Sequence, residues 1–220
     1  MAIIKDFGMV LREYDAGEAN KKLILLTRNH GKLTVFARGA RHVGSKLATG
    51  LFSYNEYVIY EGSRFYSLTA VVPVHMFDHI AQDYDKFCFA HSFLEMIDKM
   101  VMASMDTSKI LQILLCSLRE LTHGRHMPDM IFAVFAIKLL QTEGFAPLID
   151  TGGIVQTGES MLRLGPKATR ALTYILDTDA GKMYDFKASD DIAQQLYRIA
   201  RLFVAENVDA KIKSLEMIGD

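Results

Sequence analysis

The 220-residue sequence predicts an α+β, multi-domain fold in which a small five-stranded β-barrel precedes an all-α helical domain. Three observations lead to this prediction. Short β-like segments separated by turn residues fill roughly the first 75 residues. Beyond Pro73, apolar residues recur at the three- and four-residue spacing of helices. Residues 1–77 carry 10 Lys and Arg against 6 Asp and Glu, whereas the remainder carries 15 against 20, so a basic part precedes an acidic part.

The N-terminal segments are rich in Val, Ile, Leu, Tyr and Thr, which favour extended structure. We expect strands over 8–12, 21–27, 31–38, 51–60 and 65–72. Turn residues such as Asn29-His30-Gly31 divide them. In the third strand, Leu33, Val35 and Ala37 share one face, as alternation requires. Five short strands favour a closed barrel, an architecture that includes the OB-fold.

The C-terminal part predicts helices over 85–105, 107–122, 128–143, 166–177 and 189–206. Pro128 and Pro166 suit first helical positions. Residues 130–137 are apolar on every side, so we expect that helix to be central and buried. A glycine-rich insert at about 145–165 lacks periodicity and fits a long loop or a small hairpin. We therefore divide the chain into a barrel domain, 1–77, and a helical domain, 78–220.

Cysteine usage and hydropathy favour a cytoplasmic protein. Cys88 and Cys116 are too few for a disulfide framework and form no CxxC pair. The longest stretch without a charged residue, 65–77, has 13 residues and contains Pro73, which is too short and broken to span a membrane. The first residues lack the apolar core of a signal peptide.

A run of positive charge is the strongest local signal, because residues 21–46 contain seven Lys and Arg and no Asp or Glu. Such a run fits a groove that follows a phosphate backbone, with Phe36 available for base stacking. It equally fits a solvated basic face, and composition alone leaves both open. The candidate DNA-binding residues are Arg38, Arg41 and Lys46 at the centre, Lys32 and Lys22 beside them, and Arg28 and Phe36.

Sequence motifs give little support for catalysis or a metal. His75 and His79 have the spacing of one helical turn, but no third ligand is close in sequence. His123 and His126 fall in an expected interhelix loop. We therefore expect no catalytic residue, metal or cofactor. Three hypotheses remain: a DNA-binding protein, an adaptor whose barrel binds an acidic partner, and an enzyme that uses one of the histidine pairs.

Several segments resemble the bacterial RecO family in order and spacing. They are Gly8-Met9-Val10-Leu11-Arg12, Gly17-Glu18, the stretch 25–33, Ala37-Arg38-Gly39-Ala40-Arg41 with Ser45, and Phe145-Ala146-Pro147. The resemblance covers nearly the whole chain. It implies an N-terminal OB-fold and a helical domain in a non-enzymatic recombination mediator of DNA repair.

The resemblance also implies partners and a location. Family members bind single- and double-stranded DNA and anneal complementary strands. With RecR they help load RecA onto strands coated by single-stranded-DNA-binding protein. The implied location is the cytoplasm, in association with the nucleoid. Many members carry a four-cysteine zinc module after the Gly-aromatic-x-Pro segment, but residues 148–153 contain no cysteine, so we expect no zinc.

The helical domains of this family capture the acidic, apolar-ended C-terminal tail of single-stranded-DNA-binding protein. Such a tail needs a local basic pocket on an otherwise acidic domain. We place this pocket among Arg119, Arg125, Lys138, Lys167 and Arg170, with Lys138, Arg170 and Arg119 as the principal residues. The apolar helix at 130–140 is the expected floor.

Overall fold

A computed structural model describes residues 2–47, 49–102, 106–157, 160–208 and 211–218. The chain forms two compact units. The first contains Met1–Ala81 together with Val101–Leu111, and the second contains Gln82–Met100 and Gln112–Asp220. The first unit therefore extends four residues beyond the predicted boundary at residue 77 and also includes residues 101–111.

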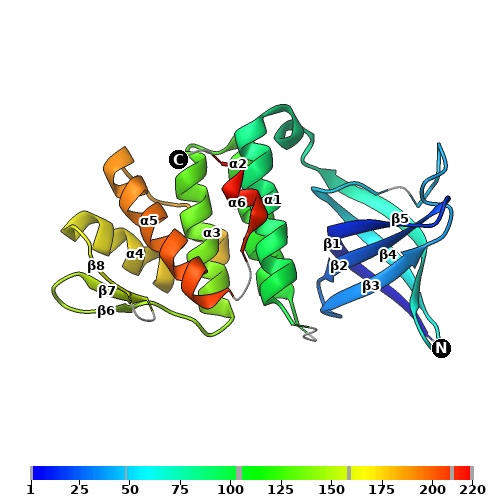
Figure 1. Cartoon of the computed structure of the whole chain (residues 1–220), viewed down its shortest axis with the longest axis horizontal. Helices are drawn as coiled ribbons and strands as arrows, with labels where there is room; N and C mark the ends of the chain where they lie inside the picture. The colour runs from blue at the N-terminus through cyan, green and yellow to red at the C-terminus, as the bar shows by residue number, and fades with distance from the viewer. Residues whose placement is uncertain (1, 48, 103–105, 158–159, 209–210, 219–220) are drawn as a thin grey trace. The chain divides into compact units, whose positions relative to one another are not determined.

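The first unit contains a closed five-stranded barrel with the strand order β1-β2-β3-β5-β4 (Figure 1). Its strands are β1 (Ala2–Ala16), β2 (Asn20–Thr27), β3 (Lys32–Ala37), β4 (Ser53–Glu61) and β5 (Tyr66–Met76). Neighbouring strands are antiparallel except β3 and β5, which run parallel. The predicted α+β fold with an N-terminal OB-type barrel is therefore confirmed.

Alternation along the strands builds the barrel core. Leu33, Val35 and Ala37 lie in it, as their spacing predicts, together with Leu23 and Leu25 of β2. The opposite face of each strand points outward, where charged and aromatic side chains meet solvent. This alternation leaves the outer face of β2 and β3 available for binding.

Two strands are longer than predicted. β1 begins at Ala2 and continues through polar residues to Ala16, because it pairs with β4 along its first half and with β2 along its second. β5 continues past Pro73 to Met76. Pro73 lies opposite Asn55, where the β4–β5 register is irregular. A strand tolerates the missing N–H of proline at such a place.

The second unit is built mainly from helices (Figure 1). The structure contains α1 (Tyr84–Met100), α2 (Ser108–His123), α3 (Pro128–Thr142), α4 (Pro166–Asp177), α5 (Asp190–Asn207) and α6 (Lys213–Glu216), with short 3₁₀ turns η1 (Asp78–Gln82) and η2 (Ala180–Lys182). The predicted end of the first helix at residues 103–105 lies outside the described residues. The short elements η1, η2 and α6 were not predicted, because one turn carries no periodic signal.

Helix α3 is central to its unit, as predicted. All residues from Met130 to Leu140 are buried, and α3 packs against α1, α4 and α5. Phe93 of α1 stacks on Phe135 of α3 with ring centroids 4.2 Å apart. A helix that is apolar on all sides requires neighbours on all sides, and here it has them.

The glycine-rich insert forms a three-stranded antiparallel sheet, β6 (Leu148–Ile149), β7 (Ile154–Thr157) and β8 (Ser160–Arg163). Of the two predicted possibilities, the hairpin is therefore observed and the long loop is not. Asp150 stabilises its first turn by accepting hydrogen bonds from the backbone N–H groups of Gly152 and Ile154. In the described part of the chain, no helix combines the length and apolar character needed to cross a membrane.

Candidate nucleic-acid interface

The outer face of the barrel carries a transverse row of aromatic and basic side chains. Tyr14 of β1 lies opposite Lys22 of β2, and Lys22 lies opposite Phe36 of β3. The Lys22 ammonium lies 5.8 Å from the centre of the Tyr14 ring, a cation–π distance. Strand register, rather than proximity in sequence, therefore brings these three side chains together.

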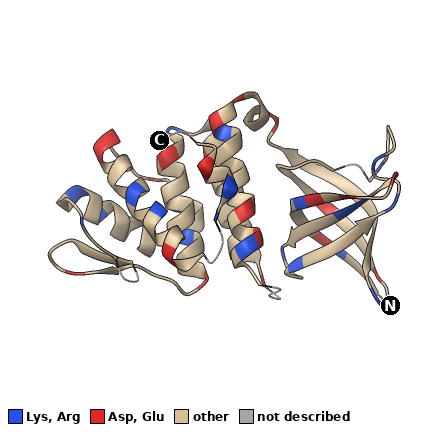
Figure 2. Cartoon of the chain, viewed as in Figure 1, with Lys and Arg blue, Asp and Glu red and all other residues tan. Residues whose placement is uncertain are grey.

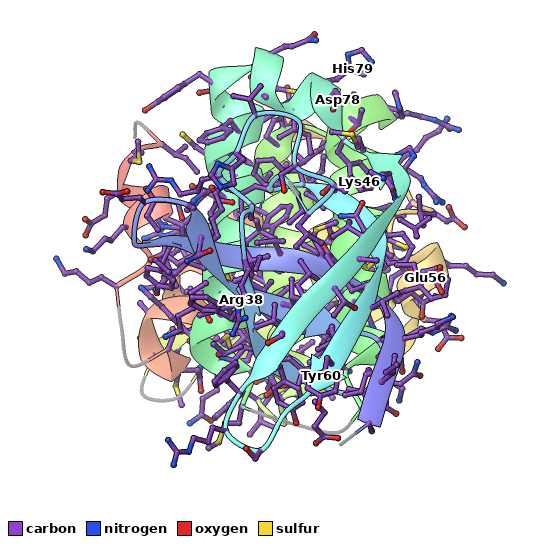
Figure 3. All side chains as sticks on the ribbon, turned by 90° about the vertical axis from the view of Figure 1, so that its right-hand side faces the viewer. Arg38, Lys46, Glu56, Tyr60, Asp78 and His79 are labelled. Atoms are coloured by element: carbon purple, nitrogen blue, oxygen red, sulfur yellow. The ribbon has the colours of Figure 1, made fainter. Side chains whose placement is uncertain are left out.

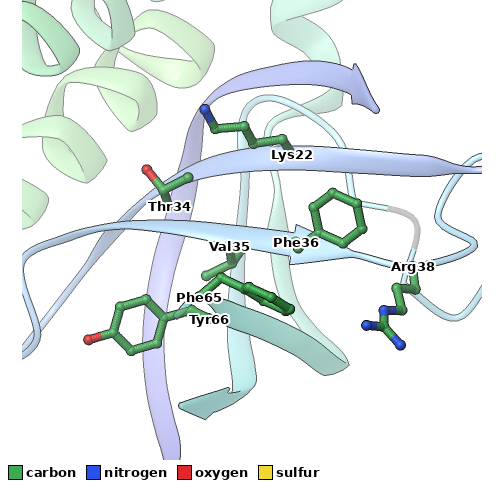
Figure 4. A pocket seen from close by; sticks show the side chains of 7 residues that line it. All are labelled: Lys22, Thr34, Val35, Phe36, Arg38, Phe65 and Tyr66. Atoms are coloured by element: carbon green, nitrogen blue, oxygen red, sulfur yellow. The ribbon is translucent and has the colours of Figure 1, made fainter. Parts of the chain in front are cut away.

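A cavity of about 290 Å³ lies at the end of this row. Its lining includes Lys22, Phe36 and Arg38 from the predicted set, with Phe65, which directly precedes β5, and Tyr66, the first residue of β5. The rings of Phe36 and Phe65 lie 6.5 Å apart, tilted by 57°. Figure 4 shows these two rings and the Arg38 guanidinium gathered around the end of β3.

A second cavity, of about 470 Å³, shares Arg38 and Phe65 with the first and adds Tyr60 and Arg64. None of the described residues that line either cavity is acidic. The Glu61 carboxylate lies outside both linings and accepts a hydrogen bond of 3.4 Å from the Tyr66 hydroxyl. The two cavities therefore form a continuous aromatic and basic surface at one end of the barrel.

The structure changes the interpretation of the basic run, because β1 supplies counter-charges that the run lacks in sequence. Lys21 pairs with Glu13 at 2.9 Å. Arg41 lies 3.4 Å from Asp15 and donates a hydrogen bond to the carbonyl of Gly17. Figure 2 shows both signs of charge on the barrel strands. Arg38, by contrast, is exposed and has no ion pair among the described residues.

The predicted DNA-binding residues do not all lie together. Lys22, Phe36 and Arg38 line the first cavity. Arg28 and Lys32 flank the β2–β3 turn, and six residues of extended chain place Arg28 about 20 Å from Lys22. In the view of Figure 3, Lys46 lies apart from Arg38, and Arg38 lines the second cavity together with Tyr60. The observed cluster is therefore narrower than the predicted set.

The sequence analysis did not include two aromatic residues of this surface, Tyr14 beside Lys22 and Phe65 beside Phe36. Tyr14 and Phe65 are 42% and 54% exposed. The available signal was two aromatic residues beside strand ends in a basic domain. Their alignment with Lys22 and Phe36 depends on the β1–β2–β3 register and the β3–β5 pairing, which the sequence does not indicate.

The histidine pairs have separate structural surroundings. His75 lies on β5, edge-on to Phe77 with ring centroids 4.6 Å apart, whereas His79 lies in η1. The ring of His126 is held at both nitrogens, by the Glu120 carboxylate at 2.8 Å and the Phe186 carbonyl at 2.9 Å. Within the described residues, no three His, Cys, Asp or Glu side chains are grouped as metal ligands.

The predicted partner-binding residues differ in exposure. Arg119 of α2 and Arg170 of α4 are exposed. Lys138 is buried in α3, where its ammonium donates hydrogen bonds of 3.1 Å to the Gln141 side chain and to the Leu176 carbonyl. Burial lowers the pKa of Lys138. Its charge is therefore engaged inside the helical unit.

An open cavity of about 600 Å³ on the helical unit carries other basic groups. Arg125 and Lys187, both exposed, line it with Phe186 and Ala188, and Glu120 and Asp185 also take part in the lining. Arg125 belongs to the predicted pocket set, whereas Lys187 was not predicted. This cavity combines cations with apolar surface.

Comparison with known proteins gives concordant matches along the chain. The family described as "Recombination protein O N terminal" matches residues 1–77, and "Recombination protein O C terminal" matches residues 81–216. The chain is 25% identical to a protein named DNA repair protein RecO from Acetivibrio thermocellus, over 99% of this chain and 97% of that protein. It is 33% identical to a protein of the same name from Bacillus pumilus, over 67% of this chain and 58% of that protein.

Proposed function

The chain belongs to the RecO family of DNA repair proteins, and from that premise we propose that it is a non-enzymatic recombination mediator. In this proposal it binds single- and double-stranded DNA and anneals complementary strands. Together with RecR it helps load RecA onto strands coated by single-stranded-DNA-binding protein. The observation that carries the proposal is the barrel surface around Lys22, Phe36 and Arg38, where cations and aromatic rings line adjoining cavities without an acidic residue among the described lining.

The physical argument for DNA is charge combined with ring chemistry. Cations that lack a carboxylate partner gain most from a phosphate, because binding releases the counterions of the DNA. Aromatic rings beside them offer stacking surfaces that serve any base. An acidic protein partner would account for the cations but not for the exposed aromatic rings. Single-stranded DNA accounts for both, because its phosphates bind the cations and its bases stack on the rings.

Salt dependence tests this proposal. Changing Lys22 and Arg38 together to alanine is expected to weaken binding of single-stranded DNA for all sequences. The slope of log K against log salt should fall by about 0.7 for each phosphate that the variant no longer neutralises. Arg41→Ala should have a smaller effect, because Arg41 is already held by Asp15 and Gly17.

Lys5→Ala is the matched control, since Lys5 is an exposed cation near the other end of β1. It removes one charge without touching either cavity. If the Lys22 and Arg38 double variant kept the wild-type slope of log K against log salt, the DNA-binding surface would lie elsewhere. Absence of DNA binding by the native protein would favour the adaptor hypothesis.

We also propose that the helical unit captures the acidic tail of single-stranded-DNA-binding protein. Arg119 and Arg170 support this proposal through their exposed charges, whereas the charge of Lys138 is engaged internally. Arg170→Glu is expected to weaken binding of a tail peptide to the full chain about tenfold, equivalent to about 1.4 kcal/mol, and to leave DNA affinity unchanged. Lys138→Met should leave peptide binding intact, and a loss there would return Lys138 to the binding site. Fluorescence anisotropy of a labelled peptide measures both.

A further inference from the structure

We propose that Tyr14, Lys22, Phe36 and Phe65 form a stacking track that accepts unpaired bases of single-stranded DNA. The inference rests on the proposed function and deepens it, since it states which part of the DNA the barrel recognises. The track crosses β1, β2 and β3 at right angles to the strands and ends at Phe65, just before β5.

Strand pairing places the side chains of the track in one row on the outer face of the barrel. Residues directly opposite on neighbouring strands place their Cβ atoms about 5 Å apart on the same face. Tyr14, Lys22 and Phe36 are such successive partners. Phe65 continues the row through its contact with Phe36. The order is therefore ring, cation, ring, ring on one outward surface.

The exposure and the relative tilt of the aromatic rings leave room for a base to stack on them. Phe65 is 54% exposed, so the protein leaves much of its ring open to solvent. Tyr14 is 42% exposed, and the cations of Arg12 and Lys22 lie 5.9 Å and 5.8 Å from the centre of its ring. The two rings of Phe36 and Phe65 are tilted by 57°, so a base that stacks on one ring meets the other at an incline. Offset stacking is one of the arrangements that aromatic pairs prefer. The cavity beside the rings supplies the room.

The cations around the rings indicate that the ligand of the track is a nucleic-acid strand. Lys22, Arg38 and Arg64 border the rings and can contact the phosphates of a strand whose bases face the barrel. Tyr14 and Phe36 lie two strands apart, about 10 Å, so a DNA strand that reaches both rings spans more than one nucleotide. In a duplex the base faces are covered by their neighbours, so only phosphates are offered. The track therefore favours unpaired bases over duplex DNA.

The test compares strands with the same phosphates but different bases. Wild-type protein is titrated with an oligothymidylate, with an abasic-spacer strand of equal length, and with a duplex. We expect oligothymidylate to bind on the order of tenfold tighter than the abasic strand, because each stacked base adds affinity. The Phe36→Ala/Phe65→Ala variant should lose most of this difference, because Tyr14 is the one ring of the track that it keeps.

Binding of the abasic strand also shows whether the double variant is folded. A folded barrel whose cations are intact should bind the abasic strand with wild-type affinity and with the wild-type dependence on salt. Phe145→Ala, which removes an exposed phenylalanine from the helical unit, is the matched control and should behave as wild type. Equal binding of both strands by the wild type would overturn the track and leave the proposed function standing. Equal weakening of both strands by the double variant would also overturn it. Failure of the wild type to bind either strand would overturn the proposed function as well.

Discussion

Replacing Gly8 by alanine is expected to destabilise the barrel by about 3 kcal/mol or more. A Cβ atom at this position would lie 2.3 Å from the carbonyl oxygen of Leu26 and 3.1 Å from the Cα of Thr27. Both atoms belong to backbone, so no side-chain rotation relieves the overlap. β1 and β2 would have to separate where they pair.

The position of Gly8 makes the effect large. Gly8 lies opposite Thr27 of β2 and also opposite Asn55 of β4, so β1 is fixed on both edges there. Just beyond this pair, the N–H of Arg28 donates to the carbonyl of Phe7 at 2.8 Å. A shift of β1 would disturb the pairing that sets Tyr14 opposite Lys22, and DNA binding should fall together with folding.

Hydrogen exchange measures this prediction unit by unit. In Gly8→Ala, amides of β1 and β2 should exchange faster, while those of α3 keep their protection. Gly50→Ala is the matched control, because a Cβ there has no described atom within 4 Å. Its exchange should be that of the wild type. Unchanged protection of β1 in Gly8→Ala would show that the strands accommodate the methyl group.

The elements with a clear apolar periodicity in sequence were predicted most accurately. The helix predicted over 166–177 coincides with α4, and the buried helix predicted around 130–137 is α3. Both have a proline at the first helical position and an unambiguous apolar pattern. The polar second half of β1 had no such pattern, because only its pairing with β2 makes it a strand.

The candidate site was only partly predictable for the same reason. Charge is visible in sequence, so Lys22 and Arg38 were found, but their relation to Tyr14 and Phe65 exists only after the barrel closes. The counter-charges Glu13 and Asp15 lie outside the basic run and reach it across the β1–β2 hairpin. A linear scan of charge therefore overestimates how many cations await a partner.

One motif of the family resemblance has a structural explanation. The buried carboxylate of Asp6 accepts hydrogen bonds from the backbone N–H of Asn29 at 2.8 Å and from its side-chain amide at 2.9 Å. The His30 ring lies 2.7 Å from the same carboxylate. Gly31 closes the turn with a positive φ of 71°. These residues hold the β2–β3 turn on β1, which accounts for a polar Asn-His-Gly segment between two apolar strands.

A second buried carboxylate, Glu95 of α1, performs a similar role in the helical unit. Its two oxygens accept hydrogen bonds from the backbone N–H of Lys213 at 3.1 Å and from that of Ser214 at 3.0 Å. The Ser214 hydroxyl donates at 2.6 Å, and the Lys99 ammonium lies 2.7 Å away. Burial acts to raise the pKa of Glu95, but these hydrogen bonds outweigh it and lower the pKa to about 2.

Glu95→Gln is therefore expected to destabilise the helical unit by about 2 kcal/mol at neutral pH, because an amide places N–H groups against N–H donors. A carboxyl with a lowered folded-state pKa stabilises the protein above its unfolded value, about 4.3, and loses that contribution as pH falls towards 2. The difference in unfolding free energy between wild type and Glu95→Gln should thus shrink below about pH 4.

Glu216→Gln, on the exposed side of the same segment, should change stability by less than about 0.5 kcal/mol. Urea unfolding at several pH values measures these differences, and faster exchange of the Ser214 amide in Glu95→Gln locates the loss at α6. A difference that stayed constant down to pH 2 would mean that the charge of Glu95 does not hold the C-terminal segment.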